Sequence, residues 1–203
     1  METFFCDDDY RAYLELMAER CRHWGVEVWA YCLMPNHVHL VVVPSTADGL
    51  ARAIGEAHRR YTRSVNFREG WGGYLWQGRF ASFAMDDVHL MAAARYVELN
   101  PVRAKLCRAP SAYKWSSAKA HVAGKDDVLV KAAPLAERAG MSWAEFLRGG
   151  LDPDDVEAMR RHERTGRPMG SAGFVERLER ILGRALRPQK PGPKPKQRQK
   201  ARR

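Results

Sequence analysis

The sequence contains few cysteines, no long apolar run and no basic opening segment. Its four cysteines, Cys6, Cys21, Cys32 and Cys107, occur without CxxC spacing in a chain of 203 residues. This pattern argues against a zinc ribbon or a disulfide framework and fits a reducing compartment. The apolar runs are far shorter than a membrane-spanning helix requires, and the acidic residues 1–9 do not resemble a signal peptide. These absences predict a soluble, cytoplasmic protein that has no membrane partner.

Acidic residues are missing from the C-terminal tail, where the positive charge is concentrated. The formal net charge is +10, and nine of the 34 Lys and Arg residues lie within residues 181–203, which contain no Asp or Glu. A basic, Pro- and Gln-rich tail with almost no apolar residue indicates disorder when unbound and affinity for a polyanion such as nucleic acid. A tail that is merely solvated is the alternative.

The hydrophobic pattern predicts an α+β fold. Apolar stripes and capping residues predict helices over residues 10–21, 46–67 and 87–100. Strand-like runs occupy residues 26–34, 37–43 and 79–85, and the first two surround a Pro-Asn break that predicts a β-hairpin. This order favours an antiparallel sheet with helices on one face.

The second half of the chain has a different hydrophobic pattern. Short helices are expected over residues 128–146, 152–163 and 171–186. We therefore divide the chain into a main domain over residues 1–123, a small helical C-terminal region over residues 124–187 and a disordered basic tail over residues 188–203.

His37 and His39 are the first candidates for chemistry. On a strand, residues i and i+2 project from the same face, so the two imidazoles lie close enough to share one metal ion. Two histidines within a hydrophobic run are costly to bury unless their nitrogens have a partner. The HxH pattern is short, and histidines that are only hydrogen-bonded near a sheet edge remain the alternative.

Tyr96 and Asn100 are the second pair of candidates. They are four residues apart on a predicted helix and therefore share one face. A phenol can act as a nucleophile, and an amide oxygen one turn later can bind a hard cation. A tyrosine on an alanine-rich helix is also a common core anchor, and spacing alone does not select Tyr96 over Tyr61 or Tyr13.

Three ordered motifs carry a family resemblance. They are Tyr-Cys-Leu-Met-Pro-Asn-His-Val-His-Leu-Val-Val at residues 31–42, Trp-Gln-Gly-Arg-Phe at residues 76–80 and Arg-Tyr-Val-Glu-Leu-Asn-Pro-Val-Arg-Ala at residues 95–104. Together with Trp-Ser-Ser at residues 115–117, they resemble the REP-associated tyrosine transposases over residues 3–123. These are relatives of the small insertion-sequence transposases that have an HUH motif and one catalytic tyrosine.

The resemblance implies a ferredoxin-like antiparallel sheet, a Mg²⁺ or Mn²⁺ cofactor and single-stranded DNA substrates near hairpins. It also implies a 5′-phosphotyrosine intermediate and a released 3′-hydroxyl. By position, His37 and His39 match the metal ligands, Tyr96 matches the nucleophile and Asn100 matches the polar residue that completes the metal shell. Family members usually begin with a strand ahead of the acidic segment. Either the true start lies upstream of Met1 or the first strand is missing, which would leave an unpaired sheet edge.

Several basic and aromatic residues are candidates for DNA contact: Arg59, Arg60, Arg63, Trp76, Arg79, Arg103, Lys105, Lys194 and Lys196. The first three form a basic helical face, and Trp76 and Arg79 are placed to stack on or clamp unpaired bases. Arg103 and Lys105 follow the Tyr96 helix, and the two tail lysines would add nonspecific affinity. A solvated surface and a core role for Trp76 are the alternatives.

The sequence therefore predicts a DNA transposase, that is, a single-strand endonuclease and ligase acting on hairpin or palindromic DNA. A catalytically impaired DNA-binding protein built on the same scaffold is the alternative. A replication initiator or relaxase would usually carry a further metal histidine and larger helicase or primase segments, and a small RNA-binding protein would make the Tyr96/Asn100 pairing accidental. Both a homodimer and a monomer are left open.

Overall fold

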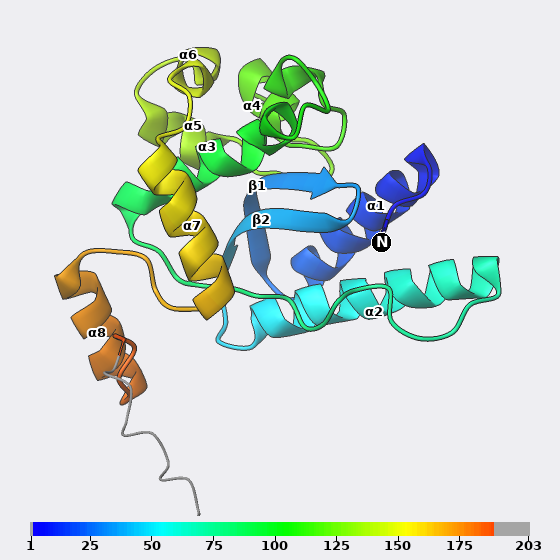
Figure 1. Ribbon diagram of the computed structural model, residues 1–203, viewed down its shortest axis with the longest axis horizontal. Helices are drawn as coiled ribbons and strands as arrows, with labels where there is room; N and C mark the ends of the chain where they lie inside the picture. Colours follow the sequence, from blue (N-terminus) through cyan, green and yellow to red (C-terminus); the bar gives the residue numbers. More distant parts are fainter. Residues whose placement is uncertain (1, 189–203) are drawn as a thin grey trace, which may run out of the picture.

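The computed structural model describes residues 2–188 and confirms an α+β fold (Figure 1). Its first part contains α1 (Asp7–His23), β1 (Val26–Met34), β2 (His37–Pro44), α2 (Gly49–Glu69) and α3 (Asp87–Arg103). Its second part contains η1 (Pro110–Ala112), α4 (Ala118–Ala123), α5 (Ala133–Ala139), α6 (Trp143–Arg148), α7 (Pro153–Thr165) and α8 (Ala172–Leu182). No helix among these described residues is long and apolar enough to cross a membrane.

The predicted β-hairpin is confirmed. β1 and β2 pair antiparallel, with Met34 opposite His37 and Cys32 opposite His39, and the register shifts once between Val28 and Ala30. The two-residue turn at Pro35 and Asn36 therefore delivers His37 directly to the start of β2. The β-branched residues of both strands favour this pleated pairing.

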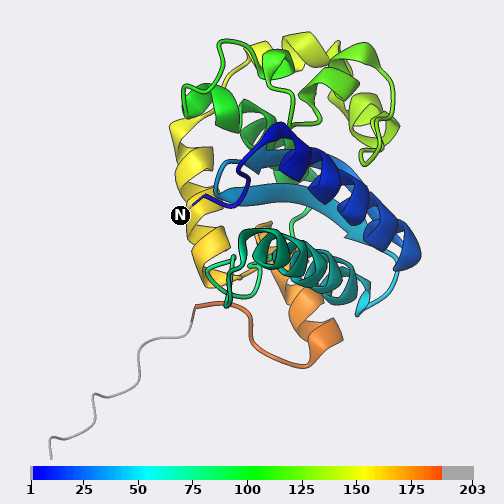
Figure 2. The same cartoon turned by 90° about the vertical axis from the view of Figure 1, so that its right-hand side faces the viewer.

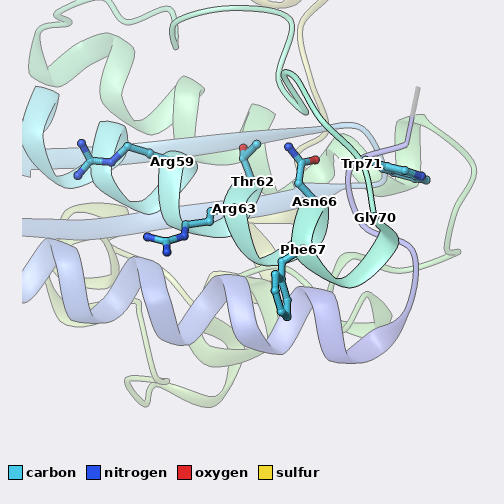
Figure 3. Close-up of a pocket in the computed structure, with 7 residues that line it drawn as sticks. All are labelled: Arg59, Thr62, Arg63, Asn66, Phe67, Gly70 and Trp71. Atoms are coloured by element: carbon cyan, nitrogen blue, oxygen red, sulfur yellow. The ribbon is translucent and has the colours of Figure 1, made fainter.

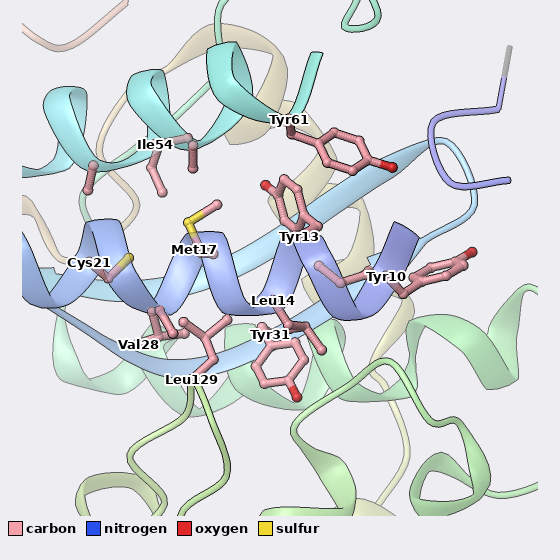
Figure 4. Packing of buried hydrophobic residues seen from close by; sticks show 14 of the residues in the cluster. Tyr10, Tyr13, Leu14, Met17, Cys21, Val28, Tyr31, Ile54, Tyr61 and Leu129 are labelled. Carbon is pink, nitrogen blue, oxygen red and sulfur yellow. The ribbon is translucent and has the colours of Figure 1, made fainter. Parts of the chain in front are cut away.

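The helices cover both faces of the hairpin, so the prediction of helices on one face was wrong. One face of β1 packs with α1 and α2 around Tyr13, Met17 and Ile54 (Figure 4). The other face, which includes Cys32 and Met34, packs with α3 and the C-terminal helices. Figure 2 shows the hairpin between these two groups of helices. Alternation along β1 makes both of its faces apolar, and the small side chains of α3 allow close approach to the second face.

Irregular segments form backbone hydrogen bonds with the edge of β1 that does not face β2. The backbone N–H of Leu33 donates to the carbonyl of Trp115 at 2.8 Å, and the N–H of Lys131 donates to the carbonyl of Val28 at 2.8 Å. These segments form isolated bridges, so the sheet within residues 2–188 has two strands. It is therefore smaller than the ferredoxin-like sheet that the resemblance implies.

The prediction of a strand over residues 79–85 was wrong. This segment joins no strand, and its one bridge pairs Met85 with Met169. The Met169 N–H donates to the carbonyl of Ala84 at 2.8 Å, just before Asp86 caps α3. The β-forming residues of the segment instead contribute Phe80 and Phe83 to the edges of the two cores.

The C-terminal helices share a core with α3. The predicted helix over residues 128–146 is two short helices, because Gly140 adopts a left-handed conformation (φ 65°) and Ser142 starts α6 with a capping box. Leu135, Trp143 and Phe146 are buried in the core that contains α3. The predictions for residues 152–163 and 171–186 correspond to α7 and α8. The predicted disordered tail lies almost wholly outside the described residues.

Candidate active site

His37 and His39 lie side by side on one face of β2, as their spacing predicts. Their Nε2 atoms are 3.0 Å apart, close enough to share one proton or one cation. The Nδ1 atom of His37 lies 2.6 Å from Oδ1 of Asn36, so an Nδ1–H donated to that acceptor leaves the Nε2 lone pair facing its neighbour. The turn residue thereby orients the first imidazole.

Both histidines favour the neutral form. Burial first, and then the charges of His37 and Arg103, lower the pKa of His39 to about 3. Desolvation first, and then Arg103, lower the pKa of His37. Neutral imidazole is the form that binds a metal, and imidazole is a common ligand of divalent transition-metal ions. The pair is therefore suited to hold a divalent cation.

Tyr96 lies beside this histidine pair. It is 7% exposed on α3, and its ring is 5.7 Å from the His39 ring, edge to face. Tyr13 and Tyr61 are instead buried in the core formed by α1 and α2. The structure thus distinguishes three tyrosines that spacing could not separate.

Asn100 and Arg103 follow Tyr96 on the same side of α3. The Arg103 guanidinium lies 4.4 Å from the centroid of the Tyr96 ring and donates to Oδ1 of Asn100 at 3.2 Å. Asn100 is 4% exposed, and its Nδ2 has no hydrogen-bond partner in the described part of the chain. Nor does a hydrogen bond within residues 2–188 join Asn100 to either histidine. The unpaired Nδ2 is a donor that an acceptor on a ligand would complete, whereas a cation would bind through Oδ1.

Glu163 of α7 is a neighbour that sequence reasoning missed. Its Oε1 atom lies 3.6 Å from Nδ1 of His39, which is beyond hydrogen-bond range. Burial raises the pKa of the Glu163 carboxyl. Among the described residues no group of three His, Cys, Asp or Glu side chains could hold a metal ion. No local pattern marks Glu163, because it reaches the site only through the packing of α7 on α3.

Glu98 was also missed, and it anchors the helix that carries Tyr96. Its fully buried carboxylate accepts from Ser117 Oγ at 2.5 Å, His121 Nδ1 at 2.6 Å and Trp143 Nε1 at 2.7 Å. These contacts tie α3 to the start of α4 and to α6. The only signal in the sequence was the placement of Glu98 and Ser117 inside two of the quoted motifs.

The candidate DNA contacts fall into separate places. Arg59 and Arg63 line a shallow hollow on α2 (Figure 3), whereas Arg60 lies 4.0 Å from Glu19. Arg103 belongs to the Tyr96 site. The exposed Lys105 has φ 60° just after the end of α3.

The remaining candidates for DNA contact do not lie together on one surface of the described residues. Trp76 stacks on His58 at 4.0 Å and packs against the α1 and α2 core, the alternative role that its residue type allowed. Arg79 is exposed. Lys194 and Lys196 lie outside the described residues.

Comparison with known proteins finds similarity to a transposase family and to a related protein. The family model for IS200-like transposases matches residues 2–100 of this chain. A protein of Haemophilus influenzae described as a REP-associated tyrosine transposase is 29% identical over 96 residues. That alignment covers 42% of this chain and 54% of the relative, so the chain spans about half of the relative's length. No solved structure matches.

Proposed function

We propose that this chain is a DNA transposase that cuts and rejoins single-stranded hairpin or palindromic DNA, with Tyr96 as nucleophile. The observation that carries the proposal is the contact between the Tyr96 and His39 rings, at 5.7 Å, beside two imidazole Nε2 atoms only 3.0 Å apart. The similarity of residues 2–100 to the IS200-like transposase family model supports the same class of reaction.

Tyr96 performs the covalent step in this proposal. Its phenolic oxygen forms a bond to the scissile phosphorus, and the bond from phosphorus to the 3′ oxygen breaks. The departing oxygen gains a proton and becomes a 3′-hydroxyl, while the phenol loses its own proton. The 5′ end stays on the protein as a phosphotyrosine, and attack by another 3′-hydroxyl reverses the step and joins the strands.

His37 and His39, with Asn100 as the third ligand, would hold Mg²⁺ or Mn²⁺. Their neutral state and facing nitrogens suit a cation, and the Asn100 oxygen can accept a second partner besides Arg103. When bound, such an ion draws charge from a non-bridging phosphate oxygen and orients the phosphate. Because Mg²⁺ prefers oxygen ligands, Mn²⁺ is the better ion with which to test a site that offers two nitrogens.

Arg103 would stabilise negative charge during the reaction. Its guanidinium lies over the Tyr96 ring, so its positive charge would stabilise a phenolate that forms there. The arginine also fixes Asn100 through the hydrogen bond to Oδ1. It can therefore position the third ligand and the nucleophile together.

The test is incubation of the full chain with 5′- and 3′-labelled hairpin DNA and Mn²⁺. We expect a labelled 3′-hydroxyl product and a denaturation-resistant adduct between protein and DNA, both abolished by Tyr96→Phe and by His39→Ala. His23→Ala, an exposed histidine at the end of α1, is the matched control and should cleave like the wild type. Hairpin binding without cleavage, unchanged by Tyr96→Phe and by chelator, would instead identify a DNA-binding protein on this scaffold.

A further inference from the structure

Three large aromatic side chains lie exposed around the C-terminal end of α2. Phe67 is 91% exposed, Trp71 is 50% exposed and Tyr74 is 94% exposed. We call these three residues the aromatic platform. Phe67 and Trp71 line one hollow, and Tyr74 follows Gly73, whose carbonyl accepts from the Asn66 side chain. Exposed apolar surface of this kind often marks an interaction site.

The loop that carries the platform is held in place. Gly70 ends α2 in a left-handed conformation (φ 67°), and the Trp71 N–H donates to the Asn66 carbonyl at 2.9 Å. The Asn66 side chain also donates to the carbonyl of Gly73 at 2.9 Å. The backbone that carries Trp71 and Tyr74 is therefore held in place before a ligand arrives, which reduces the entropic cost of binding.

Two arginines extend the platform along α2. Arg59 and Arg63 line the same hollow as Phe67 and Trp71 (Figure 3). Both are exposed, and within residues 2–188 neither forms an ion pair, whereas Arg68 pairs with Asp9 and Glu69. From Arg59 to Phe67 the helix rises about 12 Å, a length suited to a few nucleotides. Free guanidinium groups beside flat rings complement phosphates beside bases.

A short series of contacts connects the platform with the candidate active site. The Trp71 ring packs edge to face on Phe5 at 5.6 Å. The backbone N–H groups of Thr3 and Phe4 donate to the Pro35 carbonyl at 2.8 and 3.2 Å. Pro35 belongs to the turn that precedes His37. The platform therefore lies on the same end of the hairpin as the histidine pair.

We propose that the aromatic platform, with Arg59 and Arg63, binds unpaired nucleotides of the DNA strand that is cut at Tyr96. The bases stack on the three rings, and the phosphates of the same stretch lie against the two guanidinium groups. This inference rests on the proposed function for its substrate. The nucleic acid it requires is single-stranded, because the bases of a regular duplex present no free faces to the rings.

The test is fluorescence anisotropy of the full chain with a labelled single strand in the presence of chelator, so that no cleavage occurs. Trp71→Ala with Tyr74→Ala should weaken binding about tenfold for each ring removed, whereas the Phe exchanges at both positions should bind like the wild type. Arg59→Ala with Arg63→Ala should reduce the slope of log affinity against log salt by about 1.4. An abasic strand of equal length should bind the wild type as weakly as it binds the double alanine variant.

Matched controls come from exposed residues on other elements. Lys119→Ala on α4 removes a positive charge, and Met141→Ala removes an exposed apolar side chain. Both should bind the strand like the wild type. Equal affinity of the Trp71→Ala/Tyr74→Ala variant and the wild type for the strand overturns the inference. A concentration-dependent dimer that the same two substitutions abolish also overturns it, because the platform would then be a contact between copies.

Failure of the inference and failure of the proposed function are distinguishable. Strand cleavage that depends on Tyr96, together with unchanged binding by the platform variants, refutes the platform alone. Platform-dependent binding without any Tyr96-dependent cleavage refutes the transposase proposal and leaves the binding site standing. Tighter binding of single-stranded RNA than of DNA, with the same loss in the platform variants, overturns the assignment of DNA as the ligand.

Discussion

The guanidinium of Arg103 lies 4.4 Å from the centroid of the Tyr96 ring, and both residues belong to α3. Pro101 lies between them within the helix, yet the helix continues to Arg103, with the Ala104 N–H donating to the carbonyl of Asn100 at 2.9 Å. If α3 had stopped at Asn100, the arginine would not have been held over the ring. The continued helix therefore holds Tyr96, Asn100 and the Arg103 guanidinium close together.

Arg103→Ala should slow strand cleavage about 100-fold, because preorganised charge at a reacting oxygen typically contributes this much. Arg103→Lys should restore only part of the rate, since an ammonium group cannot hold the planar geometry over the ring and reach Asn100. Single-turnover cleavage of labelled hairpin DNA measures the effect. Arg22→Ala, an exposed arginine near the end of α1, is the control, and an equal loss in this variant would show a nonspecific charge effect.

Metal binding should depend on the histidine pair. Loss of an outer-shell partner alone weakens metal binding about 10- to 100-fold, so His37→Ala and His39→Ala should each weaken Mn²⁺ binding by at least that factor. Tyr96→Phe should leave the affinity unchanged. Electron paramagnetic resonance of free Mn²⁺ in a titration measures this without any DNA. Unchanged affinity in both histidine variants would exclude the pair as the metal site.

Glu98→Ala should destabilise the protein by about 3–5 kcal/mol. The substitution removes the acceptor of Ser117, His121 and Trp143 and leaves their buried donors unpaired. Urea unfolding followed by circular dichroism gives the free energy of unfolding. Glu15→Ala, at an exposed position on α1, should change it by about 0.5 kcal/mol or less. Equal stability of the two variants would contradict the anchoring role of Glu98.

His58 should make the protein less stable in mild acid. Burial lowers the pKa of His58 to about 4, while a histidine in an unfolded chain has a pKa of about 6.5. Below about pH 6.5 the unfolded chain gains the proton first, so stability that is complete above this pH is lost as the pH falls toward 4. We expect His58 to account for about 2 kcal/mol of free energy of unfolding lost between pH 7.5 and pH 5.

The measurement is urea unfolding across this pH range for the wild type and for His58→Gln, which keeps a polar group near the Tyr13 hydroxyl but does not titrate. The variant should show a shallower pH dependence, whatever its stability at neutral pH. Parallel curves for the two proteins would assign the acid sensitivity to other groups.

Leu135→Ala should test whether the C-terminal helices and α3 form one core. Leu135 is fully buried among α3 residues and Trp143, and truncation of a buried leucine costs about 2–5 kcal/mol. We expect one cooperative unfolding transition with a lower midpoint. Val88→Ala, which truncates an 80% exposed side chain on α3, should leave the midpoint unchanged. A separate early transition for the C-terminal helices would contradict a shared core.

The sequence by itself determined the local features. Alternation along β1 and β2 predicted the hairpin and put His37 and His39 on one face, because side chains on a strand repeat every two residues. Helical spacing likewise put Tyr96 and Asn100 on one side of a helix. These features depend on neighbours in the chain, so pattern alone was sufficient.

Only the tertiary structure decided which of those features meet. Tyr96 was selected over Tyr13 and Tyr61 because α3 packs on the hairpin face that carries the histidines, whereas α1 and α2 pack on the other face. Glu163 approaches His39 from a helix far along the chain. The wrongly predicted strand over residues 79–85 has the same cause, since strand formation depends on a partner that no local pattern supplies.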